Sequence, residues 1–200
     1  MKRIATTGLL ACAFLLGTVA CNQKTDSVDQ AQETNEQAAE GTAMEERKVD
    51  QSEFMTNAAS NGMLEVEAGK LAQKSAQNAE VKKFAAMMVK DHTNANSEMK
   101  KLAQQKNLTL PDSMSQEHMG DLKELRDKKG AEFDRQYMDL MVSSHEDAVS
   151  KFEDASEGLE DAELKSFAST TLTKIREHLE QARKIRDGLG NATGTATGTK

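Results

Sequence analysis

The 200-residue chain has no tryptophan, a single proline and only 4% aromatic residues. A β-sandwich or β-barrel needs aromatic and β-branched residues in its strands and turn-forming residues between them. This composition therefore disfavours both classes. The residues that dominate instead are Ala, Glu, Lys, Gln, Leu and Met, which are good helix formers. The sequence predicts an all-α protein.

Basic residues are too few for binding to nucleic acid. The chain has 26 Lys and Arg against 33 Asp and Glu, and its net charge is -7. A protein that binds nucleic acid needs a surplus of positive charge to neutralise phosphates. We therefore expect no nucleic-acid partner. The sequence names no protein partner, and it leaves open whether the chain forms a homodimer.

Both cysteines lie in the first 21 residues, in a segment typical of export signals. Two basic residues at positions 2 and 3 precede an apolar run over 4–20, which is shorter than a membrane span. The run ends in Gly-Thr-Val-Ala-Cys21, which resembles the end of a bacterial lipoprotein signal. The resemblance implies a signal peptide over 1–20, lipidation of Cys21 and, because Asn22 follows, an outer-membrane lipoprotein facing the periplasm. The alternative is a plain secretory signal that happens to contain a cysteine.

Composition divides the rest of the chain into three parts. Residues 21–51 contain no aromatic residue and few apolar ones, which predicts a flexible tether. The Gly/Thr/Ala-rich residues 188–200 predict a disordered tail. The remaining residues, 52–187, are enough for one domain with one core.

Helical periodicity predicts four long helices in this domain, over about 52–76, 79–106, 130–156 and 161–187, and a short one near 114–127. Apolar residues recur at alternating steps of four and three along the second and fourth helices, as expected for packed helices. Asn78 and Asp161 begin two similar segments, each placed as an N-cap. Two similar αα-hairpins joined by a longer crossover predict a ferritin-like four-helix bundle.

Each long helix carries one ionisable residue on its apolar side. We call this side of each helix the seam, and the four seam residues are Glu65, His92, His145 and His178. Counting from the helix turns places Glu65 and His92 within roughly 3 Å along the bundle axis, and His145 and His178 within roughly 6–9 Å. Burying such groups costs free energy unless each has a partner.

Three imidazoles and a carboxylate would suit zinc, manganese or iron as a cofactor. Asp91 or Glu146 would then orient a ligand by accepting a hydrogen bond from it. The alternative is that the histidines only organise the core, through hydrogen bonds to Glu65 or to backbone carbonyls. Methionines such as Met141 offer sulfur to copper(I), although methionine at such positions is usually core filler. His118 is expected on the surface.

The sequence does not predict an enzyme. Di-iron bundles that activate oxygen supply Glu-x-x-His from two helices. In this chain the position three residues before each seam histidine holds an apolar residue and not Glu. These residues are Val89, Val142 and Ile175. The carboxylates that ferroxidase chemistry requires are therefore missing.

Several motifs together resemble the bacterial domain of unknown function 4142. They are Phe84-Ala85, Met88-Val89-Lys90-Asp91-His92, Phe133-Asp134, Tyr137-Met138, His145 and Glu177-His178-Leu179. The resemblance covers about 52–187 and implies a ferritin-like fold in an exported or envelope protein, without an assigned activity. The chain departs from the family at Leu172-Thr173, where family members often have Leu-Pro.

Two functions are favoured, and a third, an enzyme that acts on oxygen or peroxide, is disfavoured because the carboxylates are missing. The first is a lipid-anchored envelope protein that binds a transition metal through the four seam residues. The second is a structural or stress-related interaction module.

Overall fold

The computed structural model describes residues 26–43 and 45–194, which contain six helices and no strand. In chain order the helices are α1 (Ser27–Ala39), α2 (Glu45–Ser75), α3 (Ala79–Lys106), α4 (Gln116–Asp127), α5 (Gly130–Gly158) and α6 (Ala162–Gly194). The prediction of an all-α protein is confirmed. The predicted signal peptide and Cys21 lie outside the described residues.

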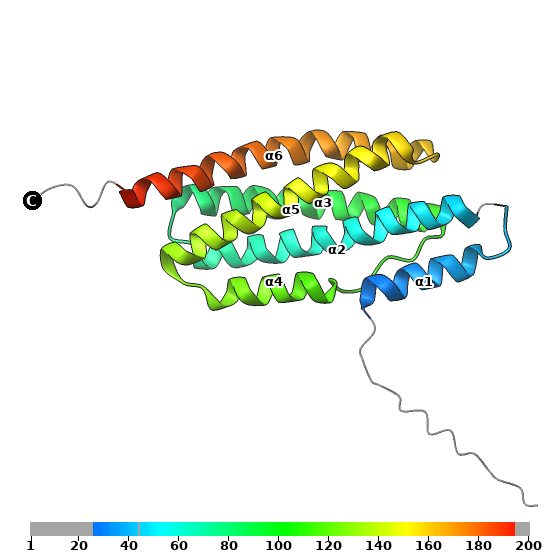
Figure 1. Ribbon diagram of the computed structural model, residues 1–200, viewed down its shortest axis with the longest axis horizontal. Coiled ribbons are helices and arrows are strands. Elements are labelled where there is room, and N and C mark those ends of the chain that lie inside the picture. Colours follow the sequence, from blue (N-terminus) through cyan, green and yellow to red (C-terminus); the bar gives the residue numbers. More distant parts are fainter. Residues whose placement is uncertain (1–25, 44, 195–200) are drawn as a thin grey trace, which may run out of the picture.

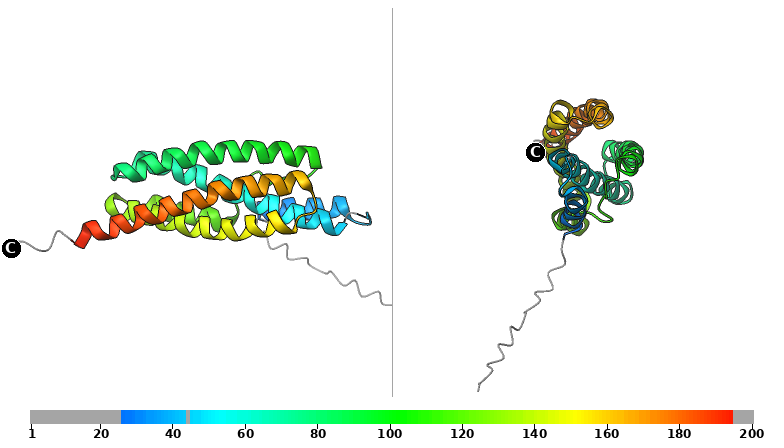
Figure 2. Two further views of the ribbon diagram at one scale, coloured as in Figure 1. Left: turned by 90° about the horizontal axis from the view of Figure 1, so that it is seen from above. Right: turned by 90° about the vertical axis from the view of Figure 1, so that its right-hand side faces the viewer.

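The four long helices form two antiparallel hairpins, α2 with α3 and α5 with α6 (Figure 1). The connection between the hairpins carries the predicted short helix, α4. Helices α1 and α4 lie one after the other along α2, on the side away from α6 (Figures 1 and 2). The long helices therefore form the body of the bundle, and the two short ones cover one side of α2.

Both predicted N-caps are confirmed. The Asn78 side chain accepts a hydrogen bond of 2.8 Å from the backbone N–H of Glu80 at the start of α3. The Asp161 carboxylate accepts bonds of 3.0 and 3.1 Å from the N–H groups of Glu163 and Leu164 at the start of α6. Each cap satisfies donors that have no partner within the helix.

The prediction of a flexible tether over 21–51 is wrong for most of that segment. Residues 27–39 form α1, and α2 begins at Glu45. The buried face of α1 is small, with Val28, Ala31 and Ala39 as its apolar residues, so composition gave little sign of it. A polar contact secures the helix, because the buried Asn35 side chain donates to Ser52 Oγ at 2.8 Å.

The expected end of the last helix near residue 187 is also wrong. Helix α6 continues to Gly194, and residues 195–200 lie outside the described part. Leu189 packs against the core, which gives the extra turns an apolar contact. Gly188 therefore lies within the helix and does not end it.

The apolar interior is divided into two clusters, one at each end of the bundle. The first surrounds Phe84, Phe133 and Tyr137, and the second surrounds Phe54 and Phe152. Between them lies a polar layer that contains all four seam residues. On α3, for example, Met88 belongs to the first cluster and Met99 to the second, with His92 between them. The polar layer is thus enclosed by apolar packing from both sides.

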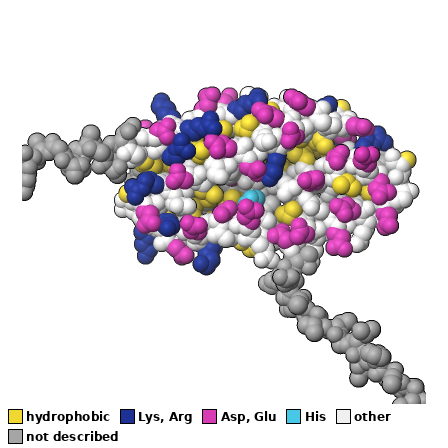
Figure 3. Space-filling view, in the orientation of Figure 1, with side chains coloured by type: hydrophobic (Ala, Val, Ile, Leu, Met, Phe, Trp, Pro, Cys, Tyr) yellow, Lys and Arg dark blue, Asp and Glu magenta, His cyan; other side chains and the backbone are white. Residues whose placement is uncertain are grey.

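The surface is predominantly acidic on the face shown in Figure 3, and Lys and Arg gather toward the end where α6 terminates. This distribution agrees with the net charge of -7. Within the described ranges, no helix has the length and apolarity needed to cross a membrane.

Candidate metal centre

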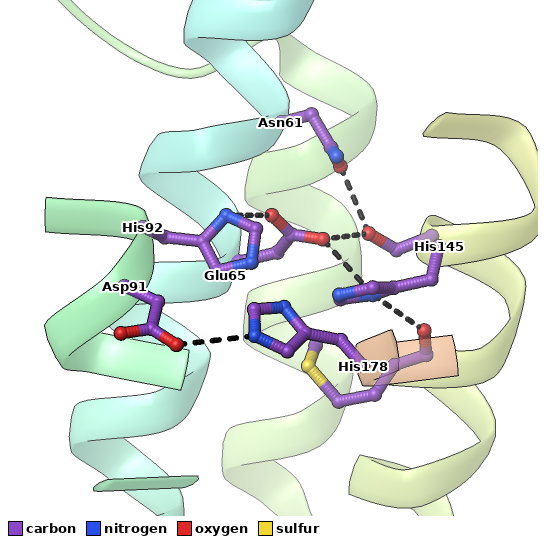
Figure 4. A network of polar contacts seen from close by, with 8 residues as sticks. Asn61, Glu65, Asp91, His92, His145 and His178 are labelled. Atoms are coloured by element: carbon purple, nitrogen blue, oxygen red, sulfur yellow. Dashed lines mark hydrogen bonds and ion pairs between the residues drawn. The ribbon is translucent and has the colours of Figure 1, made fainter. Parts of the chain in front are cut away.

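The four seam residues meet in the middle of the bundle, one from each long helix (Figure 4). Glu65 comes from α2, His92 from α3, His145 from α5 and His178 from α6. All four are buried, with exposed fractions between 0% and 8%. The helical period therefore predicted correctly that these residues face inward.

The three imidazoles lie close enough to share one ion. One nitrogen from each ring lies within 4.8 Å of the corresponding nitrogens of the other two. The ring centroids of His145 and His178 are 5.7 Å apart. Helix α5 runs further than expected, to Gly158, and the turn before α6 is short, which reduces the offset expected between these two residues along the bundle axis.

Each imidazole uses one nitrogen to bind an acceptor on the bundle. His92 Nδ1 lies 2.7 Å from Glu65 Oε2, and His178 Nε2 lies 3.2 Å from Asp91 Oδ2. His145 Nδ1 donates to the Met141 backbone carbonyl at 2.8 Å and lies 3.2 Å from Glu65 Oε1. Since a carbonyl or an ionised carboxylate can only accept, these three nitrogens carry hydrogen.

The opposite nitrogen of each neutral ring must then carry a lone pair. These atoms are His92 Nε2, His145 Nε2 and His178 Nδ1, and they face one another in Figure 4. All three are buried, and none has a hydrogen-bond partner among the described residues. A buried polar atom without a partner is costly. Three lone pairs converging on one point form a natural site for a cation.

The electrostatics of the layer are centred on Glu65. Burial alone would raise the pKa of this carboxyl, but His92, His145 and a hydrogen bond from Ser144 lower it to about 2. Burial lowers the pKa of His145 to about 4, although Glu65 opposes this shift. Burial, helped by the charge of His92, also lowers the pKa of His178. His145 and His178 are therefore neutral at physiological pH, as metal ligands must be.

His92 behaves differently from the other two imidazoles. Burial disfavours its charged form, but the adjacent Glu65 carboxylate outweighs burial and raises the pKa of His92. In the metal-free protein a proton therefore competes with a cation for this ring.

The roles predicted for the three acidic residues need correction in two cases. Glu65 was expected to bind the metal, but both of its oxygens contact the Nδ1 atoms of histidines. Glu146 was expected to orient a ligand, but it forms an exposed ion pair with Arg183 at 2.7 Å. Asp91, the other residue expected to orient a ligand, contacts His178 Nε2 through Oδ2 at 3.2 Å. His118, expected on the surface, is half-buried, with its Nδ1 2.7 Å from Ser60 Oγ.

Sequence reasoning missed Ser144 as a member of the polar layer. Its hydroxyl lies 2.7 Å from Glu65 Oε1 and 3.0 Å from Asn61 Oδ1 (Figure 4). Residues 144 and 146 flank His145 on opposite sides of α5, and only residue 144 faces α2. The sign of this role in the sequence was its position next to His145. The sequence does not show whether residue 144 or residue 146 faces the Glu65 carboxylate.

Sequence reasoning also missed two glycines that bring α3 close to α2. A Cβ atom on Gly62 would lie 2.1 Å from Asn96 Oδ1, and one on Gly69 would lie 2.8 Å from Val89 Cγ2. The two glycines are seven residues apart and stand on either side of Glu65 along the helix. At Gly69 the Ala85 backbone carbonyl of α3 would lie 3.1 Å from the added Cβ, so a larger residue there would push α3 away from α2, whereas at Gly62 only the Asn96 side chain would have to move.

The comparisons with known proteins identify a fold and a family. None of the curated proteins compared matches the chain. The fold is similar to that of a DUF305 protein from Streptomyces coelicolor described as secreted, with a TM-score of 0.61, 15% identity, and coverage of 70% of this chain and 94% of that one. It is also similar to CopM in the Cu(II)-bound form, with a TM-score of 0.60, 22% identity, and coverage of 70% and 96%.

The family assignment rests on a longer stretch of sequence. The family model of the domain of unknown function DUF4142 matches residues 32–185. This match begins inside α1, so it includes a large part of the segment that composition had assigned to a tether. Because the match covers well over half of the chain, the protein belongs to the DUF4142 family.

Proposed function

We propose that the protein binds one transition-metal ion through His92 Nε2, His145 Nε2 and His178 Nδ1. The observation that carries this proposal is the convergence of these three buried nitrogens, none of which has a hydrogen-bond partner among the described residues. The opposite nitrogen of each ring is held by an acceptor, as is usual for histidines that bind metals. The acceptors fix the orientation of each ring before any metal arrives, and in a neutral ring they also fix the tautomer.

The donor set favours copper(II) or zinc over manganese. Three neutral imidazoles suit copper and zinc, and also iron, whereas manganese prefers carboxylates, carbonyls and water. Glu65, the carboxylate within the layer, is already engaged by two imidazoles. Copper(II) also binds most tightly among the divalent ions of this series. The Cu(II)-bound form of CopM, which shares the fold, supports copper as the first metal to test.

The alternative is that the histidines only organise the core. The contacts of Glu65 and Asp91 with the rings agree with that role, but it leaves the three inner nitrogens unexplained. A purely structural layer would be expected to pair these nitrogens with donors, because unpaired polar atoms in a core destabilise the fold.

We further propose a location and an architecture for this function. The lipoprotein-like sequence ending at Cys21 supports a lipid anchor in the outer membrane, with the bundle facing the periplasm. The order of two hairpins separated by a longer connection supports a ferritin-like arrangement. The chain would act as a binding protein, because Glu-x-x-His pairs are absent from its seam helices.

Thermal melts test the metal proposal. Copper(II), zinc, manganese and iron are added separately to chelator-treated protein that was purified without a histidine tag. A metal that binds only the folded state stabilises it by about 2.7 kcal/mol at 100 times its Kd. Wild type should therefore melt at higher temperature with copper(II) or zinc, and the His178→Gln variant should lose this increment.

The matched control is His118→Gln, which replaces a histidine outside the polar layer and should keep the increment. A wild type that is indifferent to all four metals would favour the core-histidine role. An increment that His178→Gln retains would also contradict the proposed site.

A further inference from the structure

The polar layer is not equally enclosed on all sides. His145 and Glu65 have exposed fractions of 0% and 1%, and they come from α5 and α2. On the other side of the layer, a surface groove of about 450 Å³ lies between α3 and α6. His92 and His178 both line this groove, together with Asp91. Two of the three proposed ligands therefore border an open depression in the surface.

A small internal cavity adjoins the same groove. It measures about 20 Å³ and is bordered by Glu65 and His92. This volume is close to that of a single water site. Ala95, Thr171 and Ile175 line both the cavity and the groove. These side chains, together with that of His92, therefore lie between the cavity and the groove.

Asp91 stands at the inner edge of the groove. Its side chain is 33% exposed, whereas that of His178, which it contacts, is 5% exposed. Figure 4 shows one carboxylate oxygen turned toward His178 and the other turned away from it. A carboxylate in this position meets a cation before the imidazoles do. Its negative charge attracts a cation locally. The wider groove is mixed in charge, because Glu98, Lys90 and Lys174 also line it.

We propose that the groove between α3 and α6 is the access channel of the metal centre, through which the ion enters and leaves past Asp91. This inference rests on the proposed function, since it concerns the route to the same three histidines. The side chains at positions 95 and 171, one on each helix, set the width of the channel.

Exchange kinetics test the channel, with copper(II) alone as the probe. Uptake is followed after mixing metal-free protein with copper(II), and release after mixing loaded protein with excess EDTA. Ala95→Leu and Thr171→Leu narrow the channel from opposite walls. Each should slow uptake and release by about tenfold and leave the Kd nearly unchanged, because a barrier affects both directions equally.

Two further variants complete the test. Thr171→Ala widens the channel without adding volume to the core, so it should accelerate both steps even if the leucine variants fold poorly. Ala58→Leu is the matched control, because Ala58 borders the internal cavity but also a different groove, between α2 and α5. It should leave both rates close to those of wild type.

The possible results distinguish a wrong channel from a wrong metal site. Unchanged rates in the position 95 and 171 variants, in a protein that binds copper(II), would overturn the channel and leave the proposed function intact. Slower exchange in Ala58→Leu instead would place the entrance between α2 and α5 and would also overturn it. A weaker Kd with faster release in the leucine variants would show distortion of the site and contradict a gating role. A wild type that binds no metal would overturn both proposals.

Discussion

Glu65 Oε2 and His92 Nδ1 lie 2.7 Å apart inside the bundle, in a contact that joins α2 to α3. The same carboxylate reaches His145 on α5 through its other oxygen, at 3.2 Å. One buried carboxylate thus orients two of the three proposed ligands. Because burial of a charge is costly without partners, the arrangement is stable only as a connected set.

Replacement of Glu65 by Gln should weaken metal binding without removing a ligand. The amide keeps the size of the side chain but loses the charge and one of the two acceptor oxygens, so the rings are held less firmly. Loss of such a partner typically lowers metal affinity by about 10–100-fold. Calorimetric titration with copper(II) measures this change.

The matched control is Glu67→Gln, on the same helix, where the native carboxylate forms an exposed ion pair with Lys70. It should bind copper(II) like wild type. Equal affinities for the two variants would mean that Glu65 does not orient the ligands.

Metal binding should weaken as the pH falls, first because of His92. The raised pKa of this imidazole means that a proton must leave before the ion can bind. Below that pKa the apparent affinity should fall about tenfold per pH unit, as for competition with one proton. His145, with its pKa lowered to about 4, competes only in more acidic solution. Titrations in buffers of different ionisation enthalpy should show release of one proton per bound ion below the pKa of His92, and of progressively less as the pH rises through it.

The same pKa shift has the opposite consequence for the stability of the metal-free protein, which should fall as the pH rises. A raised pKa means that the folded state holds the His92 proton more tightly than the unfolded chain does. The stabilisation is therefore fully present below the unfolded pKa of about 6.5, and it is lost as the pH rises through the folded value. An affinity for copper(II) that did not depend on pH between 5 and 8 would contradict the competition between the His92 proton and the metal ion.

Asn35→Ala should destabilise the protein although it lies in a segment of low apolar content. The Asn35 side chain donates to Ser52 and to the Thr109 carbonyl and accepts from the Thr109 N–H, at 2.7–2.9 Å. Its removal leaves buried polar groups without partners, at a cost of about 1–3 kcal/mol. Chemical denaturation measures the loss, and Gln37→Ala on the exposed face of α1 is the control. Equal stabilities would show that α1 does not depend on this anchor.

Cys21→Ser should release the protein from membranes. The three acyl chains of a mature bacterial lipoprotein hold a protein firmly, whereas a single chain binds only marginally. Cell fractionation and immunoblotting detect the change, with Cys12→Ser as the control that should stay on the membrane. Persistence of the Cys21→Ser variant in the membrane fraction would contradict the lipid anchor.

The inward positions of the histidines were predictable because packed helices impose a period of about 3.5 residues. That period placed Glu65, His92, His145 and His178 on the inward sides of their helices, and all four are buried in the structure. The detailed role of Glu65 was not predictable. Whether a carboxylate binds an ion or orients the imidazoles around it depends on side-chain rotamers, which the helical pattern does not specify.

The short helix α1 was missed for a different reason. A packing face built from Val28, Ala31 and Ala39 has too little apolar character to distinguish it from a tether by composition. Its fixed position depends on contacts distant in sequence, such as the one between Asn35 and Thr109. Contacts of this kind are visible only once the fold is known.

The most direct test of the central claim is pulsed EPR on copper(II)-loaded protein purified without a histidine tag. This measurement counts the imidazole nitrogens bound to the ion. The account predicts one copper(II) per chain with three coordinated imidazoles in wild type, and loss of one of them in His178→Gln. Protein that retains no copper(II) after gel filtration, or that binds it with the same number of imidazoles in both forms, would contradict the three-histidine site.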